Sequence, residues 1–225
     1  MRISVVCLSL GVACAHSPLV AGQGLPSDRG PPPARVGFQL GLRTGLAVPL
    51  GRTDAEREMS NYFGPQVPIF VEIGGKVIPH LFVGGFLGLG FGGSAGRLKE
   101  SCTDSTCIAI GARFGAEVQY HFLPAAPTNP WVGYGLGYES VGVAASQGSR
   151  SGSLSYDGFE FAHFMAGVDF RLSRVFGLGP FASFSIGQYR QFRYEFTGEP
   201  TIEADLTEKA THEWFTLGLR TVFFP

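Results

Sequence analysis

Alternation of apolar residues with small or polar ones is the feature that most limits how this chain can fold. It is clearest from Ile108 to Phe122, where even-numbered positions are apolar or aromatic and odd-numbered positions are small or polar. Side chains of a β-strand point alternately to opposite sides, so a period of two predicts a strand with one apolar face. The even-numbered face carries Ile108, Ile110, Ala112, Phe114, Ala116, Val118, Tyr120 and Phe122.

The same period recurs along the chain and predicts an all-β protein of eight strands. The connections alternate in length: residues 49–65, 93–107, 146–156 and 191–212 are long, and Pro79-His80 and 173–175 are short. Long and short connections on opposite ends indicate an antiparallel up-and-down barrel, with at most a turn or two of helix in 53–60. The predicted strands cover residues 36–48, 66–78, 81–92, 108–122, 131–145, 157–172, 176–190 and 213–225.

Alternation alone leaves open which face is wet, since a soluble lipocalin-like barrel would turn its apolar face inward. Charged residues make up 16% of the chain, against about 25% in an ordinary soluble domain, whereas Gly contributes 33 residues and Phe 20. Small residues suit the cramped interior of an eight-stranded barrel, and aromatic residues gather at strand ends, as in a membrane-interface girdle. We therefore expect a transmembrane barrel. The positions expected near mid-bilayer, facing lipid, are Leu40, Ile69, Phe114, Leu136, Phe164, Phe184 and Leu217.

The amino-terminal segment has one Arg, an apolar stretch and the small-residue triplet Ala13-Cys14-Ala15, which predicts a cleaved secretory signal peptide over 1–15. Cleavage after Ala21, a lipoprotein acylated at Cys14, and a buried amino-terminal strand or helix are the alternatives. Gly11 disfavours the lipoprotein, because a lipobox normally has a large aliphatic residue there. Residues 16–35 are predicted to be a Pro/Gly-rich linker, and 36–225 the barrel.

Two cysteines remain after export, Cys102 and Cys107. The four residues between them suit a turn, and an oxidising compartment favours a disulfide over a metal clip, for which no further ligands lie nearby in the sequence. We expect this bridge to stabilise a surface loop by about 2 kcal/mol.

Over residues 36–225 the chain resembles the small outer-membrane β-barrels of Gram-negative bacteria, the OmpA/OmpX/OmpW-like group. The signal peptide, strand count and loop pattern carry the resemblance, together with a final strand that matches the group's insertion signal at Thr216, Gly218, Phe223 and Phe224. It departs from that signal at Thr221 and Pro225. The resemblance implies an outer-membrane location, insertion by the outer-membrane assembly machinery, and contact with lipids and lipopolysaccharide.

Chemistry-bearing motifs are few, and we expect no enzyme, cofactor or metal. Some barrels of this size are lipid-modifying hydrolases with a His and a Ser near the outer rim, but Met165 stands two residues after His163, and no Ser is tied to His212 by spacing. The Gly-rich run 84–93 lacks the helix and Lys-Ser/Thr pair of a nucleotide loop. The acidic residues of 199–208 match no compact calcium loop. A net charge of -1 and only three Lys disfavour nucleic acid.

Inward-facing charged residues predict an ion network that fills the barrel, with Glu72 between Arg43 and Arg220. Arg43, Glu72, Glu117 and Arg220 lie about five to seven residues into their strands and Arg113, Glu139 and His163 lie somewhat deeper, so all of them are expected to converge on a middle layer. A filled barrel would serve a structural or surface-interaction role through its outer loops. The first alternative is a narrow OmpW-like channel for small or apolar solutes, and the third candidate is a lipid-modifying outer-membrane enzyme. The start of the first strand, at residue 36, and the end of the last, at residue 225, would face the periplasm. The loops around Asp54, Cys102, Ser149 and Asp205 would face the exterior.

Overall fold

The computed structural model describes residues 36–54, 56–95, 102, 106–148 and 150–224, so the predicted signal peptide and linker lie outside the described part. Within it no helix is long and apolar enough to cross a membrane. Apart from the 3-10 turn η1 (Met59–Asn61), the elements are strands. They are β1 (Gly37–Gly51), β2 (Phe63–Ile78), β3 (Leu81–Ser94), β4 (Thr106–His121), β5 (Thr128–Gln147), β6 (Arg150–Arg171), β7 (Phe176–Phe196), β8 (Ile202–Asp205) and β9 (Thr211–Phe223).

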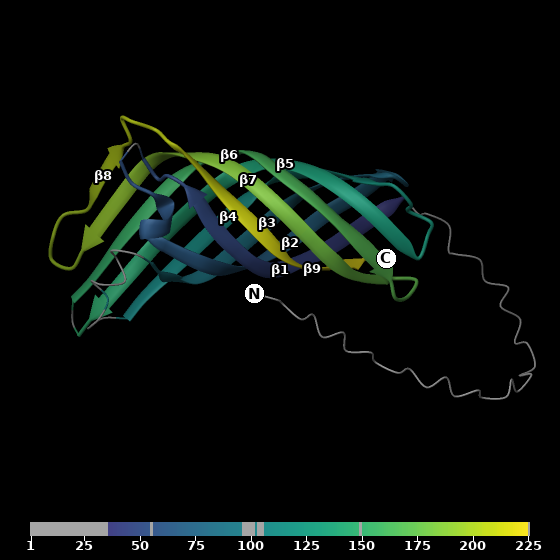
Figure 1. Cartoon of the computed structure of the whole chain (residues 1–225), viewed down its shortest axis with the longest axis horizontal. Helices are drawn as coiled ribbons and strands as arrows, with labels where there is room; N and C mark the ends of the chain where they lie inside the picture. The colour runs from purple at the N-terminus through teal and green to yellow at the C-terminus, as the bar shows by residue number, and fades with distance from the viewer. Residues whose placement is uncertain (1–35, 55, 96–101, 103–105, 149, 225) are drawn as a thin grey trace, which may run out of the picture. The chain divides into compact units, whose positions relative to one another are not determined.

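Eight of the strands form a closed antiparallel ring, and β8 lies outside it (Figure 1). The first seven strands pair in sequence order, β9 lies between β7 and β1, and each pairing is antiparallel. Closure leaves no free edge in the ring, as a barrel in hydrocarbon requires. The β7–β8 hairpin extends from one end, here called the β8 end, and the carboxyl terminus lies at the opposite end.

Apolar side chains cover the outside of the ring. Leu42 is 41% exposed and the neighbouring Arg43 is fully buried, and the same alternation continues around the ring. Six of the seven positions predicted to face lipid are exposed, and Leu40 is partly exposed on the same outward face of β1. An apolar exterior around a polar interior is the arrangement of a transmembrane barrel, so the fold is the predicted eight-stranded transmembrane β-barrel.

Several strands are longer than the sequence pattern indicates. The predicted long connection 146–156 is wrong: β5 runs to Gln147 and β6 starts at Arg150, so the two strands form one extended hairpin. Likewise β7 continues to Phe196 and pairs with the short strand β8 inside the predicted loop 191–212. Ser and Gly dominate residues 146–156, and such residues resemble loop residues in a sequence although their backbones can pair.

A bulge in β6 reverses the face assignment of Glu160. Simple alternation from His163 puts Glu160 on the lipid side, but the β6–β7 register shifts between Glu160 and Ala162. Ala162 and His163 are consecutive buried residues, and Glu160 is 1% exposed. One extra residue in a strand moves every later side chain to the opposite face, so the bulge brings a carboxylate into the barrel.

Candidate functional site

The barrel interior holds a cluster of charged residues nearer the end that carries the carboxyl terminus, here called the inner ion cluster. Arg43 Nε lies 2.6 Å from Glu72 Oε1, and Arg43 Nη2 lies 3.0 Å from Glu117 Oε2. Arg220 Nη2 lies 2.9 Å from Glu72 Oε2, and its Nη1 lies 2.7 Å from Asp169 Oδ2. The cluster thus links β1, β2, β4, β6 and β9 across the lumen.

Glu72 occupies the centre of the inner ion cluster. Arg43 and Arg220 are direct partners across the β1–β9 pair, where two like charges repel each other. The Glu72 carboxylate contacts both guanidinium groups, and all three side chains are fully buried. Gln119 completes the arrangement, because its amide donates to Glu72 at 3.2 Å and its carbonyl accepts from Arg220 at 2.7 Å. Buried charges are tolerated when they are paired and hydrogen-bonded in this way.

A second group, the outer ion cluster, lies nearer the β8 end and centres on Glu139. Its carboxylate lies 3.1 Å from Arg113 Nη2 and 2.9 Å from His212 Nε2, and it accepts a 2.7 Å hydrogen bond from Trp214 Nε1. Arg113 also lies 3.7 Å from Glu160, which is 2.9 Å from His163 Nδ1. Every ion pair of this cluster stays within it, so the predicted single middle layer is wrong. Arg113, Glu139 and His163, which lie deeper in their strands than the other predicted members, form a level of their own.

An apolar core, here called the outer plug, adjoins the outer ion cluster on the side of the β8 end and shares Trp214 with it. Met59 from η1 and Phe63 from the start of β2 insert into the ring and are fully buried. The connection after β1 therefore folds into the mouth instead of projecting from it. The plug's buried members are Ala47, Met59, Phe63, Ala109, Val141, Val143, Tyr156, Tyr189 and Trp214.

The opposite half of the barrel has its own apolar packing. Trp131, Met165 and Phe181 form a second buried cluster, and Arg220 stacks over the Trp131 ring at 4.5 Å. Two apolar clusters and two ion clusters therefore occupy the described interior of the barrel at different levels.

The sequence-predicted interior residues all lie inside the ring, and the structure divides them between the two clusters. Arg43, Glu72, Glu117 and Arg220 come together in one, and Arg113, Glu139 and His163 in the other. Sequence reasoning did not include five further members. These are Gln119, Glu160, Asp169, His212 and Trp214. Alternation along their strands places Gln119, Asp169, His212 and Trp214 on the inward face, so the sequence pattern could have identified them. It assigns Glu160 to the outward face, because the bulge cannot be seen in the sequence.

The predicted insertion-signal residues have different environments. Thr216 is buried inside the ring, Gly218 packs against the β1 backbone, and Phe223 is exposed on the outer face. Phe224 turns toward the interior rim, where Lys76 Nζ lies 5.4 Å and Arg171 Cζ 5.2 Å from its ring centre. The last aromatic residue is thus held by cation–π contacts at the end opposite β8.

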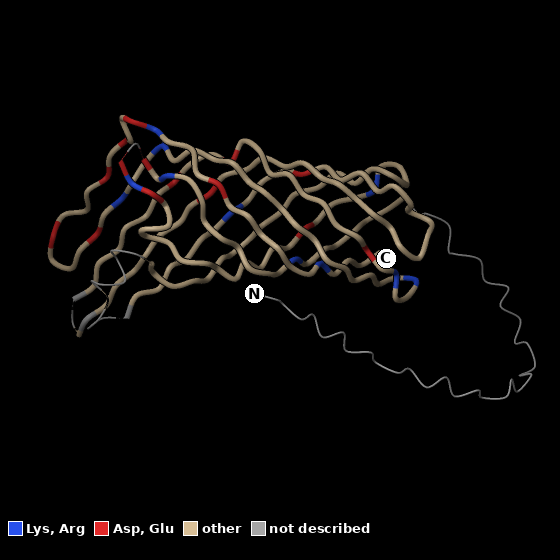
Figure 2. Tube along the Cα trace, viewed as in Figure 1, with Lys and Arg blue, Asp and Glu red and all other residues tan. Residues whose placement is uncertain are grey.

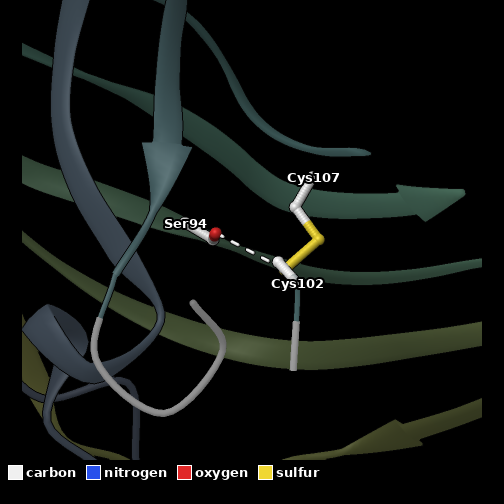
Figure 3. Close-up of a disulfide and its surroundings, with 3 residues drawn as sticks. All are labelled: Ser94, Cys102 and Cys107. Carbon is white, nitrogen blue, oxygen red and sulfur yellow. Dashed lines mark hydrogen bonds between the residues drawn. A yellow bond between two sulfur atoms is a disulfide. The ribbon is translucent and has the colours of Figure 1, made fainter. Parts of the chain in front are cut away.

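The predicted disulfide is present: Cys102 and Cys107 are bonded, with their Cα atoms 6.0 Å apart. Figure 3 shows the bridge at the start of β4, with the Ser94 hydroxyl donating to Cys102 Sγ at 3.5 Å. It ties Cys102 to the start of β4 at the β8 end. Among the described residues no group of three or more His, Cys, Asp or Glu side chains could hold a metal ion.

Comparison with known proteins supports the fold. No protein-family model matches the sequence, and no curated protein matches it. Among solved structures, outer membrane protein AlkL is similar at a TM-score of 0.50 and 14% identity, over 91% of this chain and 97% of AlkL. A major outer membrane protein of Thermus thermophilus is similar at a TM-score of 0.50 and 14% identity, over 84% of this chain and 100% of that one. The chain has the fold of the small outer-membrane β-barrels.

Proposed function

We propose that the protein is a sealed outer-membrane barrel that displays its β8 end on the cell surface as an interaction platform. The observation that carries the proposal is the filled lumen: the inner ion cluster, the outer ion cluster and the outer plug occupy successive levels of the barrel. An eight-stranded ring has room for side chains but not for a water-filled bore, so a solute has no continuous polar path.

The orientation follows from the connections. The described connections at the end opposite β8 are mostly short, as in β2–β3, whereas the disulfide, η1 and the β7–β8 hairpin all lie at the β8 end. Barrels of this class keep short turns in the periplasm and longer connections outside. On this orientation lipopolysaccharide surrounds the β8 end, and the opposite end, with Phe224, is the one that meets the assembly machinery. We assign no catalytic step to any residue.

The competing function is a narrow channel for small or apolar solutes, and conductance separates the two. Purified protein in planar bilayers should give no reproducible single-channel steps, because the buried ion pairs close the lumen. A matched positive control is Glu72→Ala combined with Met59→Ala, which removes the centre of the inner ion cluster and part of the outer plug. Regular steps from the unmodified protein would refute the sealed barrel.

A cysteine placed at Glu199, an exposed residue of the β7–β8 turn, tests the orientation. A membrane-impermeant maleimide should label it in intact cells. Labelling that requires permeabilised outer membranes would refute surface display, whatever the conductance result.

A further inference from the structure

Beyond the lipid-facing belt, the strands at the β8 end reverse their amphipathic pattern. Four segments continue past the belt, residues 141–147 of β5, 150–157 of β6, 191–196 of β7 and 202–205 of β8, and together they are here called the outer sheet. On β6, Leu154 and Tyr156 pack toward the outer plug, so the alternating residues Ser153 and Ser155 lie on the outer face. In the belt the apolar face is outside; in the outer sheet it is inside, as in a water-soluble β-protein.

The apolar inner face of the outer sheet runs from the core to an open edge. Val143 pairs with Leu154, Leu154 with Tyr194, and Tyr194 with Ile202, so their side chains form one row across four strands. Val143 is 4% exposed, Leu154 is partly buried, Tyr194 is 42% exposed and Ile202 is 55% exposed. The outer plug covers the inner half of the row and leaves its outer half, at Tyr194 and Ile202, exposed.

The row ends at β8, whose second edge is unpaired. β8 pairs with β7 alone, and among the described residues no backbone hydrogen bond reaches its other edge. β8 is four residues long and has neither Pro nor Lys; its charged residues, Glu203 and Asp205, are both acidic. An unpaired edge beside an exposed apolar face can accept a further strand by β-augmentation.

The charges on β8 indicate what that strand carries. Glu203 and Asp205 alternate with Ile202 and Ala204, so they lie on the outer face of β8. On the β7 side, Glu203 is already paired with Arg193, at 3.2 Å. An added strand therefore meets two outer-face carboxylates and two inner-face apolar residues in alternation. Figure 2 shows acidic segments at the tip of the β7–β8 hairpin, which reinforce the negative field.

We propose that β8 and the exposed end of the apolar row bind an extended polypeptide segment in which basic residues alternate with apolar ones. The inference rests on the proposed surface display and names the chemistry of its partner. The basic side chains lie opposite Glu203 and Asp205, and the apolar side chains extend the row beyond Ile202. A second copy of this chain fits poorly, because pairing two β8 edges brings their own carboxylates together.

The test uses the full protein in lipid nanodiscs and three labelled ten-residue peptides, with binding followed by fluorescence anisotropy. One peptide alternates Lys and Val, a second has the same composition with five Lys followed by five Val, and a third alternates Glu and Val. The alternating Lys/Val peptide should bind at least about fivefold more tightly than either of the others, since only it matches both faces of β8. If the two Lys peptides bind equally tightly, binding depends on net charge alone and not on the alternation of residues, and the proposal is overturned.

Two matched protein variants locate the site. Asp205→Lys should weaken the alternating Lys/Val peptide by about five- to tenfold and strengthen the Glu/Val peptide, because a cross-strand pair of opposite charges becomes one of like charges. Glu199→Lys makes the same charge change in the turn, away from the β8 edge, and should leave the affinity within about twofold. Equal effects of the two variants would overturn the edge site.

The remaining outcomes are also decisive. Failure of all three peptides to bind would overturn the partner chemistry while leaving the sealed barrel supported if the bilayer recordings show no steps. Concentration-dependent dimers in sedimentation that Ala204→Pro abolishes would assign the edge to a second copy and overturn the peptide partner.

Discussion

Replacing Glu72 by Gln tests whether the inner ion cluster holds the barrel closed. Gln preserves the size of the side chain but removes the charge that lies between Arg43 and Arg220, 2.6 Å from the first and 2.9 Å from the second. The two guanidinium groups then face each other across the β1–β9 pair, both fully buried inside the barrel. The variant should therefore weaken the pairing of β1 with β9, which joins the first strand of the ring to the last.

The magnitude follows from the burial of the group. Removing one partner of a fully buried ion pair costs about 3 to 5 kcal/mol, because the remaining charge stays desolvated. Here two arginines lose a partner, but Glu117 and Asp169 still contact them, at 3.0 Å and 2.7 Å, and the new amide still accepts one hydrogen bond. We expect a loss near the lower end, about 3 kcal/mol.

Urea unfolding of the barrel in lipid vesicles measures the loss, and the shift of the unheated band in gel electrophoresis reports the same change as a lower unfolding temperature. Glu203→Gln is the matched control: Glu203 pairs with Arg193 at 3.2 Å, but both side chains are about half exposed. Exposed pairs contribute about 0 to 1 kcal/mol. If Glu72→Gln destabilises the barrel no more than Glu203→Gln, the ion cluster does not hold the ring together.

Three further changes probe the face assignments, the disulfide and the packing around Glu72. Phe114→Arg should cost about 2 to 4 kcal/mol in vesicle unfolding, whereas Ser153→Arg, on the outer face of the outer sheet, should be nearly neutral; equal costs would contradict the reversal of the pattern. Cys102→Ser should cost about 2 kcal/mol, and a larger loss would mean that the bridge supports the ring. Gly41→Ala puts a methyl group against the Glu72 carboxylate and should cost about 1 to 3 kcal/mol, whereas Gly75→Ala, with no atom closer than 3.4 Å, should be tolerated.

The ring and its two faces could be predicted from the sequence because one physical rule covers all of the strands. Lipid outside and packed side chains inside require opposite chemistry on alternate residues, so Phe114 and Arg113 take opposite faces without any knowledge of their neighbours. The same parity brings Glu72, Arg43 and Arg220 inward. Adjacent strands then bring these three residues within reach of one another.

The sequence shows that Arg113, Glu139 and His163 lie deeper in their strands, but whether that difference separates them into a second cluster depends on the register between strands. Arg113 pairs with Glu139 as a direct cross-strand partner on β4 and β5, whereas Glu117 reaches Arg43 across the lumen. Tilt and shear decide which side chains share a level, and neither can be obtained from residue periods. Glu160 shows the same limit locally, since a single bulge changed its face.

The outer sheet combines alternation, which the sequence shows, with strand pairing, which it does not show. For this reason the outer sheet could not be predicted from the sequence. Its residues still alternate: Ser153, Leu154, Ser155 and Tyr156 follow one another with a period of two. Once the chain leaves the membrane, however, the apolar side must turn from lipid to the core, and the belt's rule assigns these side chains to the wrong face. In residues 146–156, many Ser and Gly also resemble a loop. The partner site that we propose at Ile202 lies where this reversal meets an unpaired strand, so it becomes visible only after the pairing of β7 with β8 is known.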